Sequence, residues 1–339
     1  MRVFEAKSGI TVLYNKVESP FVDIRYIVKC GSVDERVKSE YGMAHALEHM
    51  FFRGTTNRDY KEIEHETRSM GGESNAYTQA DKTVFLMNVP VESFEAGFDI
   101  LSDALYNSVF DPDLWELEKG AIVSEIRGFT EDAVSTLELK AFNHLLGDRI
   151  GHPIAGYEEV IKKAKVQDLL KFKDAFYKGS NIFISITGGV SFQQLNKVVN
   201  RYDNLDQSKP SKREFSPGKM KFNMKPMKLL NKYSEQAHIY AVKPITVPNE
   251  IADFSSAIAT ECLSNYLFDQ LRSESGLCYG VDVARTSEFP KVFFLELATS
   301  VDHKNVGATL DGIERSIDEL GSGKALTDDR IEEAYGMAY

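Results

Sequence analysis

Cysteine is scarce in this chain, with three residues in 339, and this scarcity excludes a disulfide-stabilised fold. Cys30, Cys262 and Cys278 are odd in number and widely separated, a usage typical of a reducing compartment. No run of 18 apolar residues is present, so no transmembrane helix is predicted. The first residues contain neither an apolar signal region nor an Arg-rich presequence. We therefore expect a cytoplasmic protein with no membrane partner.

Basic residues are also fewer than acidic residues. The chain has 40 Lys and Arg against 51 Asp and Glu, a net charge of −11, and no basic tract longer than a helical turn. A nucleic-acid partner is therefore not expected. The apolar fraction of 42% is ordinary for a globular protein, and 339 residues exceed what one hydrophobic core usually supports. We predict two domains.

Histidine is infrequent too, with seven residues, but two of them form a motif with chemical meaning. His45 and His49 are four apart, so on a helix their rings point the same way and can bind one metal ion. Glu48 lies between them, beside the same site. This H-x-x-E-H order is the inverse of the commoner H-E-x-x-H and supplies two ligands and a base, as in zinc hydrolases.

The surrounding residues predict the helix that this motif needs. Ser39 is expected as its N-cap and Gly54 as the residue beyond its end. An apolar stripe runs beside the histidines, formed by Met43, Leu47, Met50 and Phe51. The alternative interpretation is an ordinary amphipathic helix whose histidines are satisfied by hydrogen bonds.

A zinc site needs a third protein ligand and an open position for water. Glu118 and Glu125 are seven residues apart, two turns of a helix, so they share a face. One of them can bind the metal while the other hydrogen-bonds a histidine or the water. The alternative is a solvated acidic face.

Four stretches together carry a resemblance to a known family. They are residues 42–55 around H-x-x-E-H, residues 71–83 with Gly-Gly-Glu-Ser-Asn-Ala-Tyr-Thr, residues 118–125, and residues 272–279 with Arg-Ser-Glu-Ser-Gly-Leu-Cys-Tyr. In these stretches the chain resembles the M16 metallopeptidases, which include pitrilysin, insulin-degrading enzyme and the mitochondrial processing peptidase. The four stretches span most of the chain.

The resemblance implies a role for each matching residue. It implies that one Zn²⁺ per chain is bound by His45, His49 and Glu125, that Glu48 is the general base, and that Glu118 assists. Asn75 and Ala76 would belong to the edge strand that receives substrate. Arg272 and Tyr279 would contact substrate from the far wall of a chamber; the alternative is a surface charge and a core aromatic.

An internal repeat supports two related domains. An apolar strand at residues 84–89 is followed by an amphipathic helix, and roughly 210 residues later the same order recurs from residue 293. The second copy has no H-x-x-E-H; its corresponding helix carries residues 259–265 instead. We predict a metal-binding catalytic domain at 1–207, a linker rich in Pro, Ser and charge at 208–218, and a metal-free homologous domain at 219–339.

The predicted fold class is α+β. Strands are expected at 21–29, 83–89 and 181–188, and helices near 41–52, 59–70, 92–106, 113–128, 134–146 and 166–177. The resemblance implies two homologous domains, each an antiparallel sheet of about six strands with helices packed on one face. Because the chain stops in an apparent helix at Tyr339, we expect the second domain to be short or truncated.

These patterns predict a zinc metalloendopeptidase that hydrolyses peptides or unfolded segments within a chamber. Its expected partners are a peptide substrate and a second subunit, in a homodimer or in a heterodimer with a related chain. A catalytically silent scaffold or partner subunit of the same fold is one alternative. A zinc hydrolase acting on a small molecule is another.

Overall fold

A computed structural model describes residues 1–202, 209–213, 215, 220–229 and 234–337. These residues divide into two compact units, one of Met1–Phe129 with His152–Phe215 and one of Thr130–Gly151 with Ser216–Tyr339. Of the predicted linker, residues 208, 214 and 216–218 lie outside the described residues. The domains 1–207 and 219–339 remain a prediction, and the compact units differ from them in the assignment of residues 130–151.

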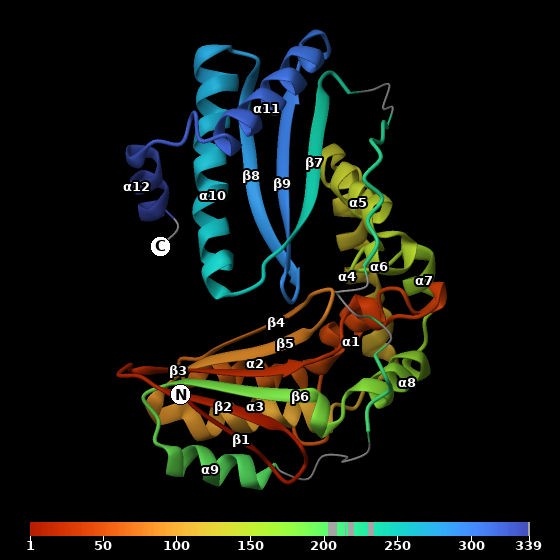
Figure 1. Ribbon diagram of the computed structural model, residues 1–339. Helices are drawn as coiled ribbons and strands as arrows, with labels where there is room; N and C mark the ends of the chain where they lie inside the picture. Colours follow the sequence, from red (N-terminus) through yellow and green to blue (C-terminus); the bar gives the residue numbers. More distant parts are fainter. Residues whose placement is uncertain (203–208, 214, 216–219, 230–233, 338–339) are drawn as a thin grey trace. The chain divides into compact units, whose positions relative to one another are not determined.

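The first unit is built on a six-stranded sheet in the order β1-β2-β6-β3-β5-β4 (Figure 1). All neighbours are antiparallel except β2 and β6. Because β6 enters between β2 and β3, which run in opposite directions, it must lie parallel to one of them. The strands are β1 Arg2–Glu5, β2 Thr11–Lys16, β3 Phe21–Val28, β4 Glu73–Thr78, β5 Thr83–Pro90 and β6 Ile182–Gly188.

Alternation along these strands directs one face of the sheet into the core. In β3 the side chains of Val22, Ile24, Tyr26 and Val28 are fully buried, whereas those between them are partly exposed. Helices pack on the buried face, and the core contains Leu47, Phe98 and Trp115 from three of them. The helices are α1 Met43–Phe51, α2 Tyr60–Ser69, α3 Phe94–Asn107, α4 Pro112–Glu131, α7 Glu158–Lys163, α8 Val166–Phe176 and α9 Phe192–Arg201.

The second unit contains a three-stranded antiparallel sheet in the order β7-β9-β8 within the described residues, fewer than the six strands expected. The described stretch 220–229, which precedes β7, forms no strand, and Pro226 has no N–H to donate to a ladder. The elements are β7 Ala237–Thr246, β8 Cys278–Phe289, β9 Val292–Val301, α5 Ala133–Leu146, α6 Asp148–Gly151, α10 Glu250–Phe268, a π-helix at Asp269–Glu274, α11 Val306–Gly321 and α12 Asp328–Met337.

Aromatic contacts explain why helix α5 belongs to the second unit. Phe142 on α5 packs edge-on against Phe294 of β9 at 5.2 Å between ring centroids, and lies 6.5 Å from Tyr240 of β7. The predicted helices at 41–52, 59–70, 92–106, 113–128, 134–146 and 166–177 are confirmed, as are the three strands. The predicted repeat is also visible, since β5 and β9 each lead through a short 3₁₀ turn into a helix, α3 or α11.

Within the part of the chain that the structure describes, no helix is both long enough and apolar enough to cross a membrane.

Candidate metal centre

Helix α1 carries the H-x-x-E-H motif, and a distant carboxylate caps its first turn. Its N-cap is Gly42, with φ of 95°, and the sequence-based choice of Ser39 is wrong. The N–H groups of Gly42 and Ala44 both donate to the Glu35 carboxylate at 2.8 Å. An added Cβ at Gly42 would lie 2.7 Å from the Ala155 carbonyl oxygen, so a side chain cannot be accommodated there.

Glu35 is itself completely buried and is paired with a second buried group. Nε2 of His152 lies 2.7 Å from its carboxylate, and the His152 ring stacks on Tyr41 at 3.7 Å. Burial raises the pKa of Glu35, and the interaction with His152 and the two N–H donors counteracts that effect only in part. Local sequence signals gave no indication of either residue, because they are 117 positions apart.

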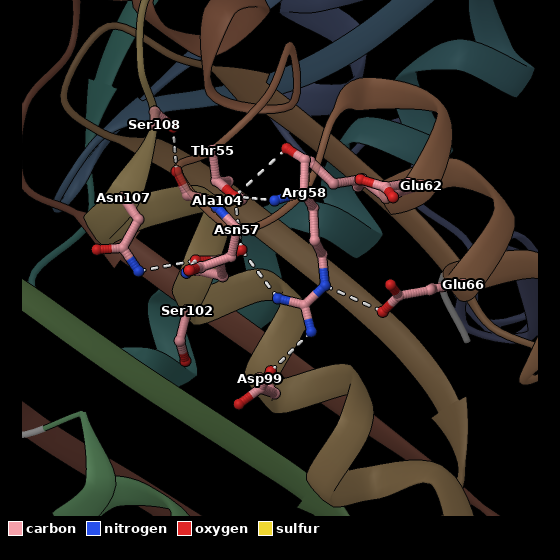
Figure 2. Close-up of polar contacts among 12 residues, drawn as sticks. Thr55, Asn57, Arg58, Glu62, Glu66, Asp99, Ser102, Ala104, Asn107 and Ser108 are labelled. Carbon is pink, nitrogen blue, oxygen red and sulfur yellow. Dashed lines mark hydrogen bonds and ion pairs between the residues drawn. The ribbon is translucent and has the colours of Figure 1, made fainter.

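The loop after α1 is fixed by a dense polar network (Figure 2). Arg58 donates to Glu66 on α2 and to Asp99 and Asp103 on α3, at 2.9 to 3.0 Å. Asp103 is 2% exposed and also accepts from Thr55, Asn57 and Asn107. Burial acts to raise the pKa of Asp103, but these donors together hold it below its ordinary value. The loop that follows α1 is thereby held to α3.

His45 and His49 of α1 come together with Glu125 of α4; His45 is buried, His49 half-buried and Glu125 exposed. One candidate ligand atom from each lies within 4.8 Å of the others. Nε2 of His45 is 3.7 Å and Nε2 of His49 is 3.6 Å from the same Glu125 oxygen. These separations are too long for hydrogen bonds. They are close to the separation of ligand atoms arranged tetrahedrally around zinc at about 2.0 to 2.2 Å, which are about 3.3 to 3.6 Å apart.

The electrostatics of this group suit a cation. Burial, followed by repulsion from His49, lowers the pKa of His45 to about 4, so its ring is neutral and can donate a lone pair near pH 7. Nδ1 of His45 is buried and has no hydrogen-bond partner among the described residues. The interaction with His49 lowers the pKa of Glu125, which is therefore an anion. Two imidazole nitrogens and one carboxylate form the donor set of a catalytic zinc site.

Glu118 orients His49 and is not itself one of the three candidate ligands. Its Oε2 accepts from Nδ1 of His49 at 3.1 Å, while its Oε1 pairs with Arg53 at 2.6 Å. Because Nδ1 of His49 faces Glu118, Nε2 is left to face Glu125, where it could bind a metal ion. Glu118 is 5% exposed, so the alternative of a solvated acidic face is wrong for this residue. Arg53, directly after α1, was not identified from the sequence.

Glu48 lies beside the same group without belonging to it. Its Oε2 is 4.0 Å from Nε2 of His45 and accepts a hydrogen bond from the Thr78 hydroxyl at 3.2 Å. Burial raises the pKa of Glu48, while the charge on His49 and the Thr78 hydroxyl act in the opposite direction. A carboxylate with a raised pKa next to a metal site is the usual form of a general base.

Asn75 and Ala76 lie in β4, which forms one edge of the six-stranded sheet. Asn75 is exposed, and its side-chain oxygen accepts from the Ala76 N–H at 2.8 Å. That N–H therefore does not take part in the ladder with β5. The strand has an edge that is open to pairing with another chain.

Comparison with known proteins agrees with this geometry. Residues 10–152 match the family model "Insulinase (Peptidase family M16)", and residues 163–335 match "Peptidase M16 inactive domain". An "uncharacterized zinc protease" of Rickettsia bellii is 30% identical over 310 residues, which are 89% of this chain and 74% of that protein. The chain belongs to peptidase family M16.

A second relative and a solved structure extend the comparison. The mitochondrial-processing peptidase subunit beta of Dictyostelium discoideum is 33% identical over 217 residues, 62% of this chain and 45% of that protein. The crystal structure of a protease from Helicobacter pylori has a TM-score of 0.85 at 17% identity, covering 98% of this chain and 82% of that chain. This likeness supports the predicted two-domain M16 fold.

The two residues predicted to contact substrate from the far wall, Arg272 and Tyr279, lie in the second unit. The Arg272 guanidinium stands 4.5 Å from the centre of the Tyr279 ring and 5.0 Å from that of Phe268. Tyr279 is 83% exposed, so the alternative of a core aromatic is wrong. The two residues form a cation–π pair between the π-helix and the start of β8, in which Arg272 is half-buried and Tyr279 is exposed.

The helix that repeats α1 in this M16 chain is α10, which contains residues 259–265. Among the described residues, His45, His49 and Glu125 form the one cluster of three or more side chains that could bind a metal ion. The metal site that the sequence predicted for the first domain therefore has no counterpart in the described part of the second unit.

Proposed function

We propose that the protein is a zinc-dependent endopeptidase that hydrolyses peptides or unfolded segments within a chamber. The observation that carries this proposal is the convergence of His45, His49 and Glu125, with Glu48 beside them. His45, His49 and Glu125 hold one Zn²⁺ per chain. When bound, zinc supplies a Lewis acid that polarises a carbonyl and lowers the pKa of water.

The protein's own side chains perform the proton transfers. Glu48 takes a proton from the attacking water and delivers it to the leaving amine. Its raised pKa supports this role, because a pKa closer to the working pH makes the carboxylate a better acceptor for the proton of the water. Glu118 keeps His49 in the tautomer and orientation that binding requires.

The substrate lies extended along β4 at Asn75 and Ala76. Main-chain pairing at a sheet edge depends little on side-chain sequence, which suits flexible peptides over folded proteins. Arg272 and Tyr279 of a partner chain contact that substrate, so the active form is a homodimer or a heterodimer with a related subunit. The exposed Tyr279 ring, with the Arg272 guanidinium over it, and the subunit named in one relative support this arrangement.

A cytoplasmic location accompanies this proposal, and the three unpaired cysteines support it. The alternative of a catalytically silent scaffold is disfavoured, because a silent subunit does not need two histidines, a base and two carboxylates arranged around one site. A zinc hydrolase for small molecules is disfavoured by the open strand edge at β4.

The test is turnover of a quenched peptide library by the purified protein. We expect hydrolysis that a zinc chelator abolishes and that added Zn²⁺ restores. A protein that contains no divalent metal and cleaves no peptide, alone or with a related subunit, would support the scaffold instead.

A further inference from the structure

The side chain of Glu48 is held by a residue outside the metal-binding motif. The Thr78 hydroxyl donates to its Oε2 at 3.2 Å, and this is the one hydrogen bond that the carboxylate makes among the described residues. The other oxygen, Oε1, has no such partner in that part of the chain. The carboxylate is 15% exposed, so bulk water cannot replace the missing contacts freely. Thr78 therefore determines which oxygen of Glu48 is left open.

Thr78 also occupies a particular place in the sheet. It is the last residue of β4 and lies opposite Thr83 in the ladder with β5. The Gln79 N–H donates to the Lys82 carbonyl at 2.8 Å, so residue 79 makes the ladder bonds at this end. Antiparallel ladders alternate, and Thr78 accordingly directs its N–H and C=O away from β5. The Ala76 N–H, bonded to Asn75 instead of β5, shows the same outward direction two residues earlier.

One residue thus joins two parts of the site. The main chain of Thr78 faces the open edge where an extended peptide would pair, and its side chain holds the base. A shift of this strand by 1 Å would displace the Glu48 carboxylate with it, and misplacement on that scale can cost about 100-fold in rate. No other described residue combines an outward main chain on β4 with a hydrogen bond to Glu48.

We propose that Thr78 is a positioning residue whose hydroxyl aligns Glu48 and couples peptide pairing along β4 to the alignment of the base. The inference rests on the proposed peptidase function. It predicts that removal of the hydroxyl impairs the chemical step while leaving the metal site and the peptide-binding edge intact.

The experiment compares Thr78→Val, which keeps the β-branched shape and loses the hydroxyl, with Thr78→Ser, which keeps the hydroxyl. Thr83→Val is the matched control, since it removes a hydroxyl from the residue directly opposite, one that donates to the Cys30 carbonyl. Zinc content, kcat and KM are measured for each full-length chain. Peptide affinity is measured in the inactive Glu48→Gln chain, with and without Thr78→Val.

We expect Thr78→Val to lower kcat about 10- to 100-fold, a smaller loss than Glu48→Gln causes. Zinc content and peptide affinity should be unchanged and KM within about twofold of the parent. Thr78→Ser should recover most of kcat, and Thr83→Val should leave kcat within about twofold. A Thr78→Val chain with parental kcat, with less zinc, or with peptide affinity weakened tenfold would overturn the proposal. So would a Thr78→Ser chain as impaired as Thr78→Val.

The peptidase function and the role of Thr78 can be distinguished experimentally. If the parent hydrolyses peptides and Glu48→Gln does not, a fully active Thr78→Val chain removes this inference and leaves the peptidase function standing. If the parent hydrolyses nothing, or Glu48→Gln equals the parent, the proposed function falls and this inference falls with it.

Discussion

At the scale of single residues, the two glutamates of α4 have different surroundings and should respond differently to the same change. Glu125 faces both histidines, whereas Glu118 faces Nδ1 of His49 and Arg53. Glu125→Gln should therefore lose zinc, because it removes the anionic ligand. Glu118→Gln should keep more zinc and lose about 10- to 100-fold in activity. Metal analysis of both variants decides this, and equal zinc loss in the two would contradict the assignment.

Arg53 gives a second prediction at this scale, since it touches no proposed ligand. It pairs with Glu118 at 2.6 Å, and its side chain is 40% exposed. Arg53→Met should weaken zinc affinity about tenfold through Glu118 and His49, while the free energy of unfolding changes by less than about 1 kcal/mol. Arg127→Met is the control on α4, because Arg127 pairs with Glu158 away from the histidines. Equal zinc affinity in Arg53→Met and the parent would show that Arg53 does not support the metal site.

At the scale of elements, the stability of α1 depends on Glu35. Glu35→Ala removes the carboxylate that caps the helix and leaves His152 without that partner. We expect it to lower the free energy of unfolding by about 3 to 5 kcal/mol, as is typical when one partner of a buried pair is removed. Urea unfolding can be followed by the single tryptophan, Trp115, which is buried in the same unit. The control is Glu62→Ala, an exposed capping-box carboxylate on α2, with an expected loss of about 1 kcal/mol. Equal losses in the two variants would refute the special role of Glu35.

Elements also show what the sequence could and could not predict. The histidine spacing and the seven-residue interval of the glutamates are properties of single helices, so the pattern identified both α1 and α4. The cap was missed because a local rule pointed to Ser39, while the actual acceptor, Glu35, reaches the helix through the tertiary fold. Arg53 and Thr78 were missed for the same reason. Their partners Glu118 and Glu48 lie 65 and 30 positions away, and no periodicity relates them.

At the scale of the whole molecule, the chain has one candidate metal site within its described residues and an Arg272–Tyr279 pair whose tyrosine is exposed. If the pair completes the site of a partner chain, a mixture of two defective chains should recover activity. Glu48→Gln lacks the base, and Tyr279→Phe lacks a hydroxyl whose loss from an oxyanion contact costs about 100- to 1,000-fold. Recovery on mixing supports the shared site. No recovery, under conditions where labelled subunits demonstrably exchange, argues for sites completed without a partner.

The central claim is that His45, His49 and Glu125 bind zinc while Glu48 performs the proton transfers. One paired measurement tests it most directly: zinc content and peptide turnover of the Glu48→Gln chain beside those of the parent. The account predicts the same zinc content, because Glu48 is not a ligand, and a loss of turnover of about 100- to 10,000-fold. A Glu48→Gln chain that cleaves as fast as the parent, or one that has lost its zinc, would contradict it.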